Sequence, residues 1–180
     1  ATALAAGAAG AARVTPDVIF SSDVTNGSFT VDKANGVELG LRGKLRFNDS
    51  NSPENTFNYD GVDTYTFKTG AAPSGFGFDP NSSTTPVWNF EWSVNTDHAG
   101  STGKNLDDFE YFMSLDVDPG PDTLIQGSSF DPINVPQADH GIGDNTTGNG
   151  GGNTGIPATG GASADLAAYE SLIANNNVAQ

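Results

Sequence analysis

Three aspartates near the middle of the chain have the spacing of the first ligands in a calcium-binding loop. Asp116, Asp118 and Asp122 lie in the segment DVDPGPD. Calcium takes about six to eight hard oxygen ligands, and carboxylates at alternate loop positions supply several of them. The twelfth loop position is Gly127, where such loops usually carry a bidentate glutamate. Two interpretations follow: a calcium site, the only cofactor that the sequence indicates, or a plain Pro-Gly turn at a strand end.

Trp88 and Trp92 form the second candidate, because they share one face of a predicted strand with Phe90 between them. Aromatic rings on an open face offer a platform on which sugar rings stack, which would make the chain a carbohydrate-binding module. The opposite face of the strand is polar, so the aromatic face is the one expected to be buried. We expect both tryptophans to pack in the core, with sugar binding as the alternative.

Each of the two histidines follows an aspartate in a glycine-rich loop, as Asp97-His98 and Asp139-His140. A carboxylate beside an imidazole can orient a metal ligand or a general base. The sequence shows no third protein ligand for a metal, so solvated loop histidines are the expectation.

Glu38, Glu91 and Glu110 fall on the polar faces of predicted strands. A glycoside hydrolase needs two carboxylates that face each other across a cleft. Carboxylates on a polar strand face are usually solvated. The sequence also lacks a nucleophile elbow, a phosphate-binding loop and a dinucleotide fingerprint. We therefore expect no enzyme and assign no catalytic residues.

The charge balance excludes whole classes of partner. The 180 residues include 22 acidic and 7 basic side chains, for a net charge of −15. Nucleic acids and anionic membranes bind through Lys and Arg, so such a surface repels them. No segment has the length of a membrane-spanning helix, so membrane insertion of this segment is not expected. Because the chain has no cysteine, disulfides and thiolate metal sites are excluded.

Hydrophobic and polar residues alternate in three stretches, over 36–47, 87–95 and 106–117. Successive side chains of a strand point to opposite faces, so this period of two predicts half-buried antiparallel strands. Further strands are predicted over 62–69 and over 28–33, the latter leading into 36–47 through the Asn35-Gly36 turn. The apolar faces should form the core, which we expect to contain Val37, Leu39, Leu41, Trp88, Phe90, Tyr111, Met113 and Leu115.

One β domain is predicted over residues 14–180. The small, uncharged residues 1–13 predict a signal-peptide remnant or an Ala/Gly-rich tail. The Gly/Asn-rich stretch 141–162 is expected to be a loop without a core, and 163–174 an amphipathic helix. The final residues, NNNVAQ, carry no strand pattern. Short strands with frequent turns predict an all-β fold, an antiparallel β-sandwich or jelly roll with one short C-terminal helix.

Several segments together resemble a group of exported bacterial proteins that carry a C-terminal PEP-CTERM or VPLPA-CTERM sorting signal. The resemblance covers residues 14–180, and the sorting tail itself is absent from this sequence. It implies export across the inner membrane and delivery to the cell surface or extracellular matrix, and it carries no catalytic signature. The segments are PDVIFSSDVTNGSFTV, GVELGLRGKLRF, WNFEWSVNTD, GKNLDDFEYFMSLDVDPG, FDPINVP, DHGIGDNTT and LIANNNVAQ.

These observations predict a non-catalytic, exported structural or adhesive protein, a subunit of a surface layer, filament or biofilm matrix. Its partners would be further copies of the chain, other surface proteins or polysaccharide, because long strands with open edges can pair with other subunits. The alternative is a carbohydrate-binding module that uses Trp88 and Trp92 with assistance from calcium.

Overall fold

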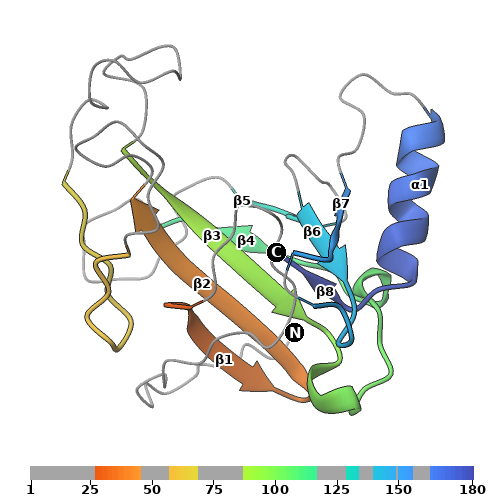
Figure 1. The fold of residues 1–180 in the computed structure, drawn as a ribbon, viewed down its shortest axis with the longest axis horizontal. Helices are drawn as coiled ribbons and strands as arrows, with labels where there is room; N and C mark the ends of the chain where they lie inside the picture. The colour runs from red at the N-terminus through yellow and green to blue at the C-terminus, as the bar shows by residue number, and fades with distance from the viewer. Residues whose placement is uncertain are drawn as a thin grey trace. The chain divides into compact units, whose positions relative to one another are not determined.

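The computed structural model describes residues 27–45, 57–68, 87–116, 129–133, 140–148, 150–155 and 163–180. They form mostly β-strands with one helix (Figure 1), which confirms the predicted antiparallel β class. The chain divides into two compact units. Unit 1 holds the described residues up to Val94, and unit 2 holds those from Asn95 onward. The prediction of one domain over 14–180 is not tested by this division and stays a prediction.

Unit 1 is built on a β-hairpin and a third strand. Strand β1 (Thr30–Ala34) pairs antiparallel with β2 (Val37–Leu45), and Ala34 lies opposite Val37. The two residues between them, Asn35 and Gly36, have φ values of 52° and 82°, the left-handed backbone that a tight hairpin turn requires. Strand β3 (Trp88–Asn95) runs antiparallel beside β2 (Figure 1). The predicted hairpin and the predicted strand over 87–95 are therefore confirmed.

The faces of strand β2 are the reverse of those predicted. Leu39 and Leu41 are 49% and 53% exposed, whereas Glu38 and Arg42 on the opposite face are buried. Gly40, on that buried face, lies under Phe29, whose Cδ1 would be 3.2 Å from an added Cβ. The inner face therefore holds charged side chains, with Arg42 covered by the rings of Phe29 and Phe57 and Glu38 paired with Lys33, and the leucines remain outside.

The remaining predicted core residues are also less buried than expected. Trp88 is 43% exposed and Leu115 is exposed, while Val37, Phe90, Tyr111 and Met113 are half-buried. The prediction of the core is therefore wrong, because none of these residues is fully buried. Among the described residues, the buried hydrophobic side chains of unit 1 are Phe29, Val31 and Val94, and those of unit 2 are Leu106, Ile133, Ile142, Tyr169, Ile173, Val178 and Ala179.

Unit 2 contains strands that the sequence did not predict. Strand β6 (His140–Gly143) pairs antiparallel with β7 (Asn153–Gly155) on one side and with β8 (Val178–Ala179) on the other. Gly141 and Gln180 exchange backbone hydrogen bonds of 2.9 and 3.0 Å. The expected coreless loop over 141–162 therefore supplies two strands, and Ile142 within it is fully buried. The absence of a closing strand near the end of the chain was a wrong expectation.

Helix α1 (Ser163–Ala174) confirms the predicted helix (Figure 1). Tyr169 and Ile173 are buried on one stripe, while Leu166 on the same stripe is exposed. The Tyr169 hydroxyl donates a hydrogen bond of 2.7 Å to the carbonyl of Ile133. No helix among the described residues is both long and apolar enough to cross a membrane.

Two predicted strands are mostly irregular. Residues 57–68 contain only an isolated bridge between Tyr59 and Tyr65. The stretch predicted from residue 106 begins instead as the 3₁₀ helix η2 (Leu106–Asp108), and a second 3₁₀ turn, η1 (His98–Gly100), precedes it. Only β4 (Met113–Ser114) remains as strand, paired with β5 (Ser129–Phe130).

Candidate functional site

The segment 57–68 of unit 1 is shaped by one aspartate. The Oδ1 atom of Asp60 accepts hydrogen bonds from the backbone N–H groups of Val62, Asp63 and Thr64, at 2.7, 3.1 and 3.2 Å. These bonds stabilise the carboxylate and lower the pKa of Asp60. The resulting turn brings the rings of Tyr59 and Tyr65 into a stack, with centroids 4.7 Å apart. The segment is thus a tight turn that carries aromatic side chains on its arms.

Tyr65 anchors this segment to the hairpin of unit 1. Its hydroxyl donates a 2.5 Å hydrogen bond to the carbonyl of Ser28 and lies 3.1 Å from Thr30 Oγ1. Partial burial raises the pKa of the Tyr65 phenol, against the opposing effect of the Thr30 hydroxyl. The phenol therefore stays protonated and keeps its donor, which holds the aromatic segment in place.

Phe67 lies directly on strand β2. A Cβ atom added at Gly43 would be 2.7 Å from Phe67 Cε2, too close to be accommodated without a shift, and 3.0 Å from Tyr65 Cβ, which is also a tight contact. The Phe67 ring is also nearly parallel to Trp88, with centroids 5.8 Å apart and an interplanar angle of 9°. Because Gly43 has no side chain, the ring can rest on the backbone and stack on the tryptophan.

These residues enclose an open hollow on unit 1, which we call the aromatic hollow. Its volume is about 370 Å³, and its lining consists of Gly43, Tyr65, Phe67, Trp88 and Phe90. Of the described residues that line it, four are aromatic and none carries a charge. Such a surface offers aromatic rings, which suits a ligand with an apolar face.

The structure separates the two tryptophans that the sequence analysis grouped. Trp88 lies in the hollow and is partly exposed, so the expectation that it packs in the core is wrong. Trp92 is half-buried and does not line the hollow. Sequence reasoning missed Gly43, Tyr65 and Phe67. The alternation of Tyr65 and Phe67 in TYTF was a usable signal, because it places both rings on the same side of an extended segment.

The buried face of β2 holds an ion cluster, which we call the Arg42 cluster. Arg42 donates from Nε to Glu91 Oε2 at 2.6 Å and from Nη1 to the Gly27 carbonyl at 2.6 Å. Lys44 Nζ lies 2.8 Å from Glu91 Oε1. The guanidinium carbon is 4.2 Å from the Phe29 ring centroid and 4.6 Å from that of Phe57. Burial lowers the pKa of Arg42, and the Glu91 charge opposes this shift.

The three glutamates considered for glycoside hydrolysis have different environments. Glu91 binds both cations of the Arg42 cluster, and buried Glu38 forms an ion pair of 2.8 Å with Lys33. The expectation of solvated carboxylates is therefore wrong for these two residues. Only Glu110 is exposed. Neither Glu38 nor Glu91 therefore has the solvated environment of a carboxylate that acts as a general acid or base.

In unit 2, the carboxylate of Asp97 organises its own loop. Its carboxylate accepts hydrogen bonds from the Thr102 N–H at 2.5 Å, the Thr102 hydroxyl at 2.9 Å and the Gly103 N–H at 3.0 Å. These bonds, that of the Thr102 N–H first, lower the pKa of Asp97. His98 is half-buried in η1, and His140 lies in β6. In the Asp97-His98 pair, the aspartate therefore has a structural role.

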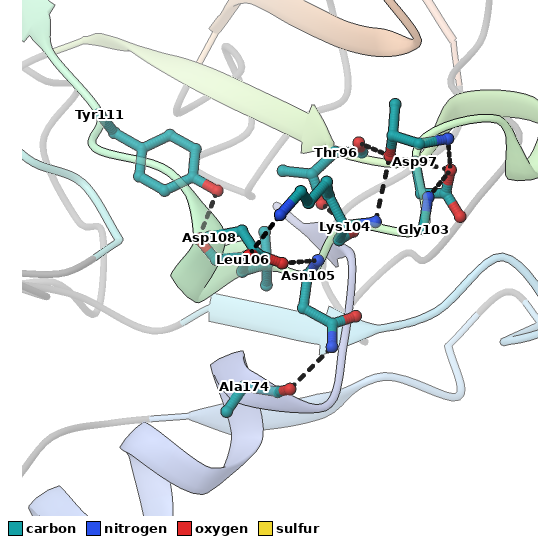
Figure 2. Close-up of polar contacts among 10 residues, drawn as sticks. Thr96, Asp97, Gly103, Lys104, Asn105, Leu106, Asp108, Tyr111 and Ala174 are labelled. Carbon is teal, nitrogen blue, oxygen red and sulfur yellow. Dashed lines mark hydrogen bonds and ion pairs between the residues drawn. The ribbon is translucent and has the colours of Figure 1, made fainter.

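The same loop is tied to the end of helix α1 (Figure 2). Asn105 Nδ2 donates to the Ala174 carbonyl at 2.8 Å, and the Asn105 N–H donates to Asp108 Oδ2 at 2.9 Å. Lys104 pairs with Asp108 at 2.9 Å, and the Tyr111 hydroxyl donates to the Leu106 carbonyl at 2.7 Å. This network uses its polar groups internally, which indicates a structural role.

The calcium prediction falls largely outside the described residues. Asp118 and Asp122 lie there, and Asp116 is exposed at the end of a described stretch. Among the described residues, no three His, Cys, Asp or Glu side chains gather closely enough to hold a metal ion. The calcium site at Asp116, Asp118 and Asp122 stays a prediction.

Comparisons with known proteins add no relative. No family model matches the chain, and neither a curated protein nor a solved structure is significantly similar to it.

Proposed function

We propose that the chain is a non-catalytic adhesive protein that binds polysaccharide at a bacterial cell surface or in the extracellular matrix. The observation that carries this proposal is the aromatic hollow, in which Trp88 is 43% exposed beside a parallel Phe67 ring. An indole ring left partly exposed in a hollow lined by further aromatic rings favours a binding role. Aromatic rings are the surface on which the apolar face of a pyranose packs.

The carboxylates of unit 1 support binding over catalysis. Glu91 is bound to Arg42 and Lys44, and Glu38 is bound to Lys33. A general acid or base must be free to exchange a proton with substrate. Within the described part of unit 1, Glu91 instead neutralises two largely buried cations, and buried Glu38 is paired with an exposed lysine.

The proposed location outside the cytoplasm rests on composition and on the resemblance to the PEP-CTERM and VPLPA-CTERM group. For the architecture we propose a β-sandwich or jelly roll. On strand β2, Phe29 covers the inner face at Gly40, and Tyr65 and Phe67 cover the outer face at Gly43, while Leu39 and Leu41 on the outer face stay exposed. Cover on both faces of a strand, even over part of its length, supports a layered β fold.

A glycan array probed with the purified chain tests the proposed function. We expect binding to at least one polysaccharide class, and loss of that binding in Trp88→Ala. Phe112→Ala is the matched control, because Phe112 is an exposed aromatic residue of unit 2, outside the hollow. Adding a chelator to a parallel array tests the calcium-assisted version. An array without any hit at high protein concentration would refute the proposal.

Self-assembly is the second candidate function, and a specific observation favours it. Leu39 and Leu41 are exposed side by side along β2, next to the edge strand of the described hairpin. Exposed apolar residues and open strand edges are common contact surfaces between subunits of layers and filaments. Because the net charge of −15 opposes self-association, assembly should strengthen with added salt or calcium. Sedimentation velocity across salt concentrations distinguishes a monomer from an assembling subunit.

A further inference from the structure

The aromatic hollow has a chemical selectivity that can be read from the charges around it. Among the described residues, its lining carries no ionisable group except the Tyr65 phenol, and burial raises the pKa of this phenol and keeps it protonated. A binding site for uronate, sulfate or phosphate groups would need Lys or Arg side chains within reach of the ligand.

The cations of unit 1 are committed elsewhere. Among its described residues, Lys33 is paired with Glu38, and Arg42 and Lys44 are paired with Glu91. Lys68 is the one further described cation, exposed next to Phe67. Within the described part of unit 1, Lys68 is thus the one cation outside these ion pairs, and a single such charge on a chain of net charge −15 does not offset the repulsion that an acidic polysaccharide would meet.

We infer that the ligand of the aromatic hollow is an uncharged polysaccharide, bound by stacking and insensitive to salt. This inference rests on the proposed function and narrows its ligand class. An uncharged chain of pyranose rings loses no Coulomb energy on approaching the acidic surface, whereas a polyuronate does. At about 370 Å³ the hollow is near the lower end of ligand sites, so it contacts a short stretch of the polymer.

Gly43 is the residue that positions this site. An added Cβ atom at residue 43 would be only 2.7 Å from the Phe67 ring, so alanine there must shift the ring and disturb its parallel stacking on Trp88. The backbone at Gly43 is not left-handed, so the substitution acts through contact and not through φ. A displaced ring would remove half of the parallel pair on which the sugar packs.

The test is calorimetric titration of the whole chain with neutral and acidic glycans at about 50 and about 500 mM NaCl. The neutral probes are cello-, xylo- and manno-oligosaccharides and dextran, and the acidic probes are alginate and polygalacturonate. We expect a neutral probe to bind with a Kd that changes less than about twofold between the two salt concentrations. Gly43→Ala and Trp88→Ala should each raise that Kd about tenfold or more, equivalent to one lost stacking contact.

The controls separate this inference from the proposed function. Gly148→Ala is the matched glycine control, because nothing lies within 4 Å of its added Cβ, and it should leave the Kd unchanged. If Gly43→Ala does not fold, Phe67→Ala replaces it. If the chain binds acidic glycans more tightly than neutral ones, and Lys68→Gln abolishes that binding, the inference is overturned and the proposed function stands. If a neutral glycan binds with a Kd that neither Gly43→Ala nor Trp88→Ala changes, the aromatic hollow is not the binding site. If no glycan binds at all, the proposed function itself is overturned.

Discussion

Replacing Glu91 with glutamine should destabilise unit 1 by about 3 kcal/mol. Glu91 is the anion that neutralises Arg42 and Lys44 on the covered face of β2. Their side chains are 0% and 13% exposed, so water can compensate little for a lost partner. Removing one member of a buried ion pair costs about 3–5 kcal/mol. Glutamine keeps a neutral oxygen for one hydrogen bond and Lys44 keeps some solvent, which places the expected loss at the lower end.

Urea unfolding followed by tryptophan fluorescence measures this loss. Both tryptophans of the chain, Trp88 and Trp92, lie on β3 on either side of Glu91, so the signal reports on unit 1. Glu110→Gln is the control, because that glutamate is exposed in unit 2. We expect it to change stability by less than about 0.5 kcal/mol.

A double variant separates the charge effect from packing. Arg42→Met combined with Glu91→Leu removes both charges of the closest pair, and should recover at least half of the loss, since apolar replacements of buried pairs are often neutral. If Glu91→Gln costs less than about 1 kcal/mol, the pair behaves like a surface salt bridge, and the reasoning about the covered face of β2 is refuted.

Three further outcomes are expected. Leu41→Ser should change the free energy of unfolding by less than about 0.5 kcal/mol in urea, because Leu41 is exposed, and a large loss would restore the core predicted from sequence. Asn95→Ala should cost about 1–3 kcal/mol, because buried Asn95 accepts from Asn177 at 2.9 Å and donates to Asn145 at 2.7 Å; thermal unfolding checks this against Asn175→Ala. The folded state lowers the pKa of Asp97, so its contribution to stability is present above the unfolded pKa of about 3.9 and is lost as pH falls through the folded value. Thermal scans between about pH 2 and 6 should therefore show a shallower acid decline for Asp97→Asn than for the natural chain, and parallel curves would contradict this.

The sequence predicted elements well where local chemistry decides them. The Asn35-Gly36 turn follows from residue types that adopt left-handed backbone, and the hairpin around it follows directly. Helix α1 follows from its apolar stripe at 163–174. These features need only neighbours a few residues apart, so a single sequence contains them.

The sequence could not show which face of β2 is covered. A period of two has two equivalent faces, and polarity was the only criterion available for choosing between them. Phe29 and Phe57 reverse that choice by enclosing Arg42. The complementary charges of Arg42 and Glu91, on polar faces of different predicted strands, were a clue that these faces could be buried together.

Only part of the candidate site could be predicted from the sequence, because the rest depends on contacts between distant residues. Trp88 and Phe90 were recognised, but the rest of the hollow depends on where the irregular segment 57–68 lies. Its placement is determined by Asp60 closing a turn and by Tyr65 bonding to Ser28, far away in sequence. Likewise, the glycine-rich strand β6 forms because β7 and β8 pair with both of its edges. Such contacts override local propensity.

In unit 2, Asn145 joins two loops through its bonds to Asn95 and Asp97, and this bears on the choice of expression host. Asn145 begins the tripeptide Asn-Thr-Thr, which is an acceptor for N-linked glycosylation in a eukaryotic secretory pathway. In the folded chain its Nδ2 donates to the Asp97 carbonyl at 2.8 Å, while its Oδ1 accepts from Asn95. An oligosaccharide attached to Nδ2 before folding would place a bulky group on the atom that joins these loops. Chains secreted from yeast or insect cells should therefore fold less efficiently than the same chain made in bacteria.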